Sequence, residues 1–591
     1  MKEREKEQND GIFRNSALIA DRTKKMALTY IGSTICVAAV TLADSLIAGI
    51  SIGPEALAAI AAAGPLLTIE QILHCLLGFG IDKLMIREIG KGKRKEADRI
   101  FGAVLIAVTV VYVLVYLLLL LFERPLLECF MDDQTLIDNV IRYTQPLFVS
   151  APFFEVFLCV ERAFRVDGRA RFFSLRSIIT NIANIVLDIL MVTVWDLELP
   201  GLAWSSVIST VLGYLITLSH FFHPQRTVTP DFSVIKCWNE MLSYLKEDLR
   251  LGGSATLDEV LDAVALSVQT TAIGFVGGSG GLAIWAVFKS LRGLVLSMGN
   301  GASASVTTHA GLLNGQRDYD GVRYAVKKGV AISVTASLLA MLLVNIFADG
   351  IAELYRVEAE LRGLCTPCLR IGCIVFPAIG FLTVMSAYLP AVNRIKLTNL
   401  LIVIQKGLTV VSAAIGYSLD MKGFYTAYVL ALCLAALILL ILLAHDRFWF
   451  VPERNPELIQ SYSLQLKKEQ IAAVSDDAAR VLSGRLFPED FCYRVSQVVE
   501  DSAAYIAQMN GDSPVHADIQ MRHQEDHVQI MIIDDGEAYN PLTEIAEANW
   551  KQPGAVEAVS VLGLSARVNY DRVLGLNNLS LDVNLTEQAG A

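Results

Sequence analysis

The sequence predicts an all-α polytopic membrane protein with twelve transmembrane helices in two six-helix lobes, followed by a C-terminal cytosolic α+β sandwich domain. Three observations support this fold class: apolar runs of bilayer-spanning length, basic turns that repeat along the chain, and a change of charge after residue 450. Of the 591 residues, 54% are hydrophobic and only 18% are charged, whereas soluble proteins carry roughly 25% charged residues. A string of soluble domains is therefore excluded.

Twelve apolar runs are long enough for a helix to cross a bilayer, which takes about 20 residues. Inside hydrocarbon each run must be helical, because a helix satisfies its own backbone groups. The predicted spans are 27–49, 57–81, 101–122, 144–164, 172–194, 202–221, 253–276, 282–303, 324–347, 367–388, 397–416 and 424–444.

The spans and the charges divide the chain into domains. Residues 451–591 contain 22 acidic and 10 basic side chains, whereas the first 450 residues contain 38 acidic and 39 basic ones. Because this acidic tail has no basic stripe, we expect no nucleic-acid partner. The predicted domains are a cytosolic N-terminal tail (1–26), an N-lobe (27–221), a cytosolic inter-lobe linker (222–252), a C-lobe (253–448), a linker (449–462) and a C-terminal domain (463–591).

Lys and Arg indicate the orientation of the spans, because they collect on the cytoplasmic side. Seven lie in residues 1–26 and seven more in residues 82–100. The loops that follow the even-numbered spans are richer in these residues than the loops on the opposite side. We therefore expect a multi-pass protein of the cytoplasmic (inner) membrane with both termini in the cytoplasm.

Two cytoplasmic turns of the first half recur in the second half. Gly92 of the turn after span 2 corresponds to Gly315 after span 8, an offset of 223 residues. Gly168 after span 4 corresponds to Asn393 after span 10, an offset of 225 residues. Two offsets that agree so closely indicate two six-helix halves in the same orientation, which is typical of transporters.

Several segments of the first half resemble the multidrug and toxin extrusion (MATE) family of the MOP flippase superfamily. The similarity covers roughly residues 12–448 and implies two lobes around a central cavity, alternating access, and export driven by an inward H⁺ or Na⁺ gradient. The segments that carry it are Asp44–Gly49 (DSLIAG), Gly53–Ala59 (GPEALAA), Pro65, Gly90–Arg99 (GKGKRKEADR), Arg165–Gly168 (RVDG) and Asn184–Asp188 (NIVLD).

Acidic residues inside spans are costly and are therefore candidates for ion coupling. Asp188 follows Asn184 by four residues and Asn181 by seven, so all three share one helical face. A carboxylate beside carboxamide oxygens can bind Na⁺ or hold a proton. The family resemblance implies that Asp44, Asn181, Asn184, Asp188 and Ser206 form the N-lobe cation or proton site. The alternative is a structural polar lock between the first and fifth spans.

A second acidic group, Asp258, Glu259 and Asp262, lies on the seventh span. The resemblance implies a secondary cation site at Asp262, although the acid expected on the tenth span is absent. Lys289 and Arg292 on the eighth span are expected to neutralise the group. Among the other acids, we expect Asp82 to be solvated at the end of its span. For Glu70 and Glu155 two interpretations remain open: a functional role, or hydrogen bonding to neighbouring groups or to the cavity.

The tail alternates short strands and helices. We expect strands at 463–466, 515–522, 527–534, 570–574 and 578–585, and helices at 467–484, 491–508 and 557–568. Helices grouped with mainly antiparallel strands give an α+β sandwich. His523 and His527 fall in strands, so neither is expected to act as a phosphoacceptor on a helix.

Residues 532–542 (IIDDGEAYNPL) resemble the Asp-x-Gly box of the histidine-kinase-like ATPase fold, in its anti-sigma-factor-kinase branch. The resemblance implies nucleotide-binding roles for Glu500, Asp534, Gly536 and Gly563. Tyr505 replaces the Asn that holds Mg²⁺ in that family, and a phenol is a poor Mg²⁺ ligand. Val561 replaces the first lid glycine, which removes a close backbone approach. These changes argue against catalysis and leave ATP only a weak, Mg²⁺-independent contact.

The combined hypothesis is an H⁺- or Na⁺-coupled antiporter, not an enzyme, that exports small organic cations or other amphipathic compounds. Its tail would be a degenerate ATPase-like regulatory domain with a cytosolic protein partner. We expect no required cofactor and no metal site, since the single CxxC at Cys365 and Cys368 is best explained by helix packing. Two alternatives remain open: a lipid-linked oligosaccharide flippase of the same superfamily, and a membrane signalling receptor that acts through the tail.

Overall fold

The computed structural model describes residues 17–47, 51–52, 54–129, 131, 133–166, 170–218, 228–355, 357–445, 459–524, 526–539 and 555–585. The chain divides into two compact units, of which one holds the long helices and the other the C-terminal sheet. The predicted fold class is confirmed: long apolar helices make up the first unit, and a small antiparallel sheet is present in the second.

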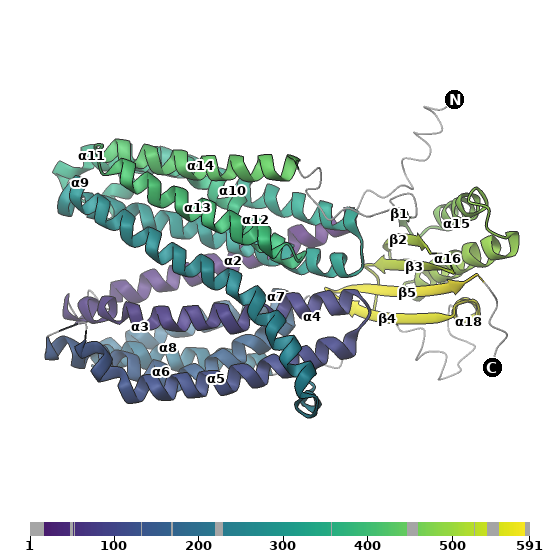
Figure 1. Ribbon diagram of the computed structural model, residues 1–591, viewed down its shortest axis with the longest axis horizontal. Helices are drawn as coiled ribbons and strands as arrows, with labels where there is room; N and C mark the ends of the chain where they lie inside the picture. The colour runs from purple at the N-terminus through teal and green to yellow at the C-terminus, as the bar shows by residue number, and fades with distance from the viewer. Residues whose placement is uncertain are drawn as a thin grey trace. The chain divides into compact units, whose positions relative to one another are not determined.

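The N-lobe helices lie side by side in Figure 1, as do those of the C-lobe. The N-lobe contains α2 (Ala17–Ile47), α3 (Pro54–Gly78), α4 (Ile81–Gly90), α5 (Arg94–Glu128), α6 (Gln134–Val166), α7 (Ala170–Asp188), a π-helical turn η2 (Ile189–Val194) and α8 (Glu198–Leu218). The C-lobe contains α9 (Trp238–Gly315), α10 (Tyr319–Leu354), α11 (Ala359–Gly372), a 3₁₀ turn η5 (Cys373–Val375), α12 (Phe376–Ala391), α13 (Ile395–Gly416) and α14 (Met421–His445).

Within the described residues, ten helices are long and apolar enough to cross a membrane. One of them, α9, contains both the seventh and the eighth predicted spans, because the helix is interrupted at Gly278. Gly278 has φ 56° and ψ −149°, a conformation that only glycine adopts readily. The first predicted span falls on α2 and runs past its described end.

The inter-lobe linker is more ordered than the sequence predicts. A 3₁₀ turn, η4 (Phe232–Lys236), begins where the Asp231 carboxylate accepts from the Ser233 amide at 2.9 Å. Helix α9 then starts at Trp238, well before the predicted span. The linker therefore includes an amphipathic extension of α9 that packs against α4 and α5.

Glycine contacts join the two lobes within the helical unit. A Cβ on Gly252 of α9 would lie 2.0 Å from the Leu76 carbonyl of α3. A Cβ on Gly90 of α4 would lie 3.0 Å from the Cα of Gly315 at the end of α9, and Gly315 approaches Gly90 equally closely. Small residues let helix backbones approach this closely, and here the repeated turns of the two halves meet.

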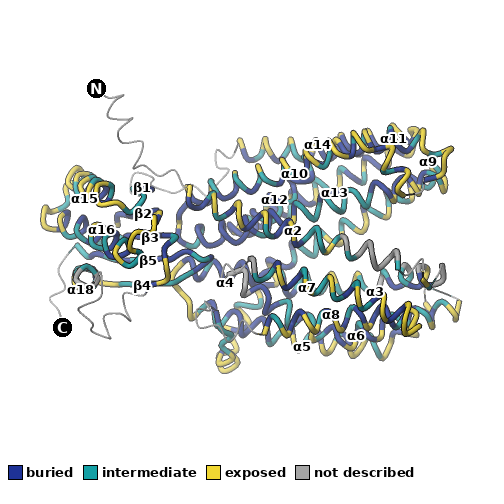
Figure 2. The backbone as a smooth tube through the Cα atoms, turned by 180° about the vertical axis from the view of Figure 1, so that it is seen from behind, coloured by how far each residue is buried: buried dark blue, intermediate teal, exposed yellow. Residues whose placement is uncertain are grey.

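Figure 2 shows exposed stretches along the helices in yellow, and many of the exposed residues are large and hydrophobic. On α5, Leu114, Leu117, Leu118 and Leu121 are all more than half exposed. A water-soluble protein rarely exposes so continuous an apolar surface. This face is suited to lipid tails.

The C-terminal unit is a five-stranded antiparallel sheet with helices packed against it (Figure 1). Its elements are β1 (Ile459–Gln465), α15 (Lys468–Ser483), α16 (Glu489–Met509), β2 (His516–His523), β3 (His527–Asp534), α18 (Ala555–Leu564), β4 (Arg567–Val573) and β5 (Leu576–Asn584), in the sheet order β1-β2-β3-β5-β4. A tight turn at Leu574 and Gly575, both with positive φ, closes the β4–β5 hairpin.

The sheet unit has its own hydrophobic core. Alternate residues of β2 and β3, among them Ile519 and Ile530, meet Val495 and Val498 of α16 and are fully or almost fully buried. β1 begins at Ile459, within the predicted linker, and α18 ends before the predicted helix does. The other predicted elements agree with the structure to within about three residues.

His523, at the end of β2, is a titratable residue buried by this packing. Its ring is 3% exposed, stacks on Phe487, and has no hydrogen-bond partner for either nitrogen among the described residues. Burial lowers the pKa of His523 to about 4. The folded tail therefore binds this proton less well than the unfolded chain, so stability is lost as pH falls from 6.5 towards 4.

We expect acidification across this window to remove about 3 kcal/mol of tail stability through His523. His523→Leu should abolish this contribution, because leucine fills the space and does not titrate. Urea unfolding of both proteins between pH 7 and pH 4 measures it as the difference between them. This difference removes the opposing contribution of Asp534, whose pKa burial raises to about 6. A difference that does not change with pH would contradict the prediction.

Candidate functional site

The N-lobe site is built around Asp188, the last residue of α7. Its side chain is 0% exposed. The Ser205 hydroxyl on α8 hydrogen-bonds to its Oδ1. One turn earlier on α7, Asn184 Nδ2 donates to Ser206 Oγ at 3.4 Å. The π-helical turn η2 begins directly after Asp188, and such turns are frequent at functional sites.

The hydroxyl of Ser205 has two acceptors within reach but only one proton to donate. Its Oγ lies 2.7 Å from the Leu202 carbonyl oxygen as well as within bonding distance of Asp188 Oδ1. If Asp188 is protonated, it donates to Ser205, and Ser205 donates to Leu202. Both contacts of the Ser205 hydroxyl are then hydrogen bonds, and no charge is buried. The geometry therefore suits a carboxyl group that carries a proton.

The predicted N-lobe set is partly brought together. Asn184, Asp188 and Ser206 lie at the α7–α8 contact, and Asn181 Nδ2 is buried with no hydrogen-bond partner among the described residues. Asp44 falls in α2, but its side chain lies outside the described part of the chain. The sequence analysis did not identify Ser205, whose hydroxyl group bonds to Asp188.

The C-lobe acids form ion pairs with two cations. Lys406 on α13 places its Nζ 2.5 Å from Asp262 Oδ1 and 3.1 Å from Asp258 Oδ1. Arg292 Nη2 lies 3.4 Å from the same Asp262 oxygen. Lys406 is only 8% exposed, so its charge is held between the two carboxylates. The position where a free cation could bind is occupied by the chain's own ammonium group.

The expectation that Lys289 neutralises these acids is wrong. Among the described residues Lys289 makes no ion pair, and Lys406 takes that role from a different helix. Arg292 pairs as expected. Glu259 makes no ion pair within the described residues, and that part of the chain contains no cluster of His, Cys, Asp and Glu suited to a metal ion.

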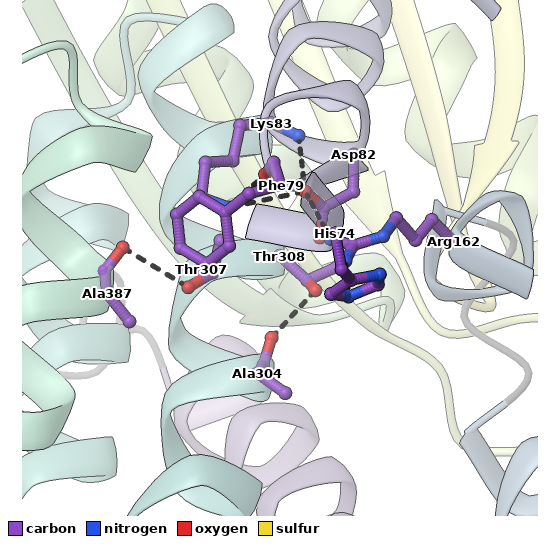
Figure 3. A network of polar contacts seen from close by, with 9 residues as sticks. All are labelled: His74, Phe79, Asp82, Lys83, Arg162, Ala304, Thr307, Thr308 and Ala387. Carbon is purple, nitrogen blue, oxygen red and sulfur yellow. Dashed lines mark hydrogen bonds and ion pairs between the residues drawn. The ribbon is translucent and has the colours of Figure 1, made fainter. Parts of the chain in front are cut away.

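The expectation that solvation explains Asp82 is also wrong. Asp82 is 2% exposed. Its carboxylate lies 3.4 Å from Lys83 Nζ and 3.9 Å from Arg162 Nη1 (Figure 3). Glu155 is buried and lies 2.9 Å from the imidazole of His74. The N-lobe thus contains a second charged network, away from Asp188.

In the tail, the carboxylate of Asp534 is already occupied by the protein's own donors. Its Oδ1 accepts from the Gly536 amide at 2.9 Å and from Asn577 Nδ2 at 2.7 Å. Its Oδ2 accepts from the hydroxyl of Tyr539 at 3.0 Å. Asp534 is 0% exposed. An adenine amino group would have to displace one of these donors to reach it.

Three tyrosines fill the space beside Asp534. The ring centroid of Tyr539 lies 5.4 Å from that of Tyr505 and 4.9 Å from that of Tyr570. Tyr505 is thus part of an aromatic cluster, at the position where the resembled family has its Mg²⁺-binding Asn. The described structure does not bring Glu500 or Gly563 into this cluster: Glu500 accepts from Ser475, and Gly563 is exposed on α18.

Two similar helical lobes that carry acidic residues inside their spans are typical of membrane transporters. Comparison with known proteins identifies which kind. The MatE family model matches residues 30–190 and 265–418, just over half of the chain. The chain belongs to this family.

A curated relative is the multidrug export protein MepA of Staphylococcus saprophyticus, which is 24% identical over 250 residues. The match covers 41% of this chain and 52% of MepA, so the chain spans about half the length of that relative.

Solved structures share the fold of the helical unit. An outward-facing multidrug resistance MATE family transporter is 20% identical, with a TM-score of 0.67 over 73% of this chain and 98% of that one. A MOP superfamily transporter from Pyrococcus furiosus is 20% identical, with a TM-score of 0.66 over 72% and 96%. A mutant of the Vibrio cholerae MATE transporter VcmN is 19% identical, with a TM-score of 0.66 over 73% and 97%.

The C-lobe ion pairs can be tested by removing Lys406. Lys406→Met should lower the thermal stability of the purified protein in detergent by about 1–3 kcal/mol, because partly buried carboxylates then lose their counter-ion. Adding Asp262→Asn should recover most of that loss. Lys289→Met is the matched control and should have no effect. Equal stability of the Lys406 and Lys289 variants would show that the ion pairs contribute nothing.

Proposed function

We propose that this protein is a proton-coupled antiporter that exports organic compounds by alternating access. Family membership supports a transport function, and the similarity to the multidrug export protein MepA suggests drugs or similar amphipathic molecules as substrates. The distribution of Lys and Arg among the loops supports an inner-membrane location with both termini in the cytoplasm.

The observation that carries the choice of coupling ion is the bond between Asp188 and Ser205. A protonated Asp188 completes a chain of hydrogen bonds to the Leu202 carbonyl, as described above. Na⁺ would need several oxygen ligands at once, whereas Asn184 turns its amide nitrogen, and not its oxygen, towards Ser206. Asp258 and Asp262 of the C-lobe are paired to Lys406 and Arg292, so these two carboxylates do not need an external cation.

In this proposal Asp188 binds a proton from the outside and releases it to the cytoplasm in alternate states. Substrate binding and proton binding exclude each other, so an inward proton gradient drives substrate outwards. The asymmetry between the lobes follows from their residues. The N-lobe carboxylate can lose and gain a proton, and the C-lobe carboxylates have a fixed internal partner.

Transport in proteoliposomes tests the coupling. A fluorescent organic cation such as ethidium should be moved by a pH gradient and not by a sodium gradient alone. Asp188→Asn and Ser205→Ala should each reduce gradient-driven transport by about tenfold or more, with normal amounts of folded protein. Asp196→Asn, an exposed carboxylate nearby in sequence, is the matched control. Transport driven by sodium alone, or unchanged in Asp188→Asn, would contradict the proposal.

For the tail we propose a regulatory domain that binds a cytosolic protein partner rather than using ATP. The support is the occupation of Asp534 by Gly536, Asn577 and Tyr539. Adenine has no free approach while Tyr539 is bonded there. The resemblance to the ATPase fold then reflects shared architecture without its chemistry.

Calorimetry of the full-length protein with ATP tests this idea. The wild type should show no binding, with or without Mg²⁺. Tyr539→Ala should create weak, Mg²⁺-independent binding, because it frees Asp534 Oδ2 and opens a space. Tyr539→Phe is the matched control, since its ring keeps the space filled. Tight Mg²⁺-dependent binding by the wild type, lost in Asp534→Ala, would show a working nucleotide site instead.

A further inference from the structure

His74 on α3 is held between two charged side chains of α6. Its Nδ1 lies 2.9 Å from Glu155 Oε2, and its Nε2 lies 2.9 Å from Arg162 Nη2. Both partners are buried, whereas the His74 side chain is 20% exposed. Figure 3 shows the imidazole reaching towards Arg162, with Asp82 and Lys83 beyond it. Neither coupling candidate described above includes this network.

The hydrogen-bond donors assign the protonation state of His74. A guanidinium group can only donate, so Nε2 must accept with its lone pair. The ring proton is then on Nδ1, where it is donated to the Glu155 carboxylate. His74 is therefore a neutral imidazole in this state, and its one vacant position for a proton is the nitrogen that Arg162 now contacts.

A proton on Nε2 would force Arg162 to leave, because two donors would then face each other. Arg162 Nη1 is already 3.9 Å from Asp82 Oδ1. On α9, Asp248 is 1% exposed, and its Oδ1 has no hydrogen-bond partner among the described residues. Burial raises the pKa of Asp248 to about 8, although the charges of Arg162 and Lys83 oppose this shift. Asp82 is thus the carboxylate that is placed to receive Arg162.

Each element packed around this network contributes charged or titratable groups. Asp258 is paired with Lys406 of α13, and the remaining carboxyl groups outnumber the cations Lys83 and Arg162. The groups are Glu70 and Cys75 on α3, Asp82 and Lys83 on α4, Tyr112 and Tyr116 on α5, Glu155, Cys159 and Arg162 on α6, and Asp248, Asp258 and Glu259 on α9.

We propose that His74 is a proton-binding site whose occupancy transfers Arg162 from His74 to Asp82. The transfer fastens α6 to α4, the short helix that packs against α9. The inference rests on the proposed antiport function and adds a second proton site to it, with a role in controlling the contact between the lobes. The proton binds the Nε2 lone pair, and no other bond changes except the hydrogen bonds of Arg162.

Hydrogen exchange of the full-length protein in lipid nanodiscs tests the transfer without substrate or gradient. After correction for intrinsic rates, a peptide covering 81–90 should be about tenfold more protected at pH 5.5 than at pH 8. His74→Gln should remove this difference, because glutamine keeps a donor and an acceptor but cannot titrate. Asp82→Asn should also reduce it, because the acceptor on α4 loses its charge.

His527→Gln in the tail is the matched control and should keep the full pH response. A response that persists in both His74→Gln and Asp82→Asn would overturn the proposal, as would no response in the wild type. Because the measurement uses no transport, it separates the two proposals. A pH response that depends on His74, combined with transport that ignores the pH gradient, would keep the switch and reject the antiport function.

Discussion

An ionised group that leaves water must be hydrogen-bonded, paired or protonated, and this constraint explains how the helical unit places its acids. Asp188 meets it with the Ser205 hydroxyl, which leaves the carboxyl able to hold a proton. Asp262 meets it with Lys406 and Arg292, which keeps the carboxylate charged and paired. The two lobes share an architecture, but their acids have different partners and are therefore suited to different roles.

In the proposed switch, the same constraint links proton binding to helix contacts. A buried charge that loses one partner must find another, so a proton that displaced Arg162 from His74 would strengthen its contact with Asp82. The close glycine contacts between α4 and α9 would transmit a shift of α4 to α9. In the tail, which lies outside the membrane-spanning part, the buried carboxylate of Asp534 accepts hydrogen bonds from Asn577 and Tyr539.

Much of the fold could be predicted from the sequence, because span length and strand alternation are local properties. The partners of the charged groups could not. Ser205 and Ser206 are adjacent and both bond to α7, so only the packing of α8 against α7 shows which hydroxyl reaches Asp188. Lys406 is 144 residues from Asp262, so only helix packing reveals the pair. Asp82 lies at the end of a predicted span, and its position in the sequence does not show that other helices cover it.

The central claim is that Asp188 exchanges a proton for substrate. The most direct measurement is proton release when substrate is added to the detergent-solubilised protein in weakly buffered solution. The account predicts release by the wild type, largest where Asp188 is protonated before substrate binds, and a clear loss of that release in Asp188→Asn. Equal proton release by the wild type and by Asp188→Asn would contradict it.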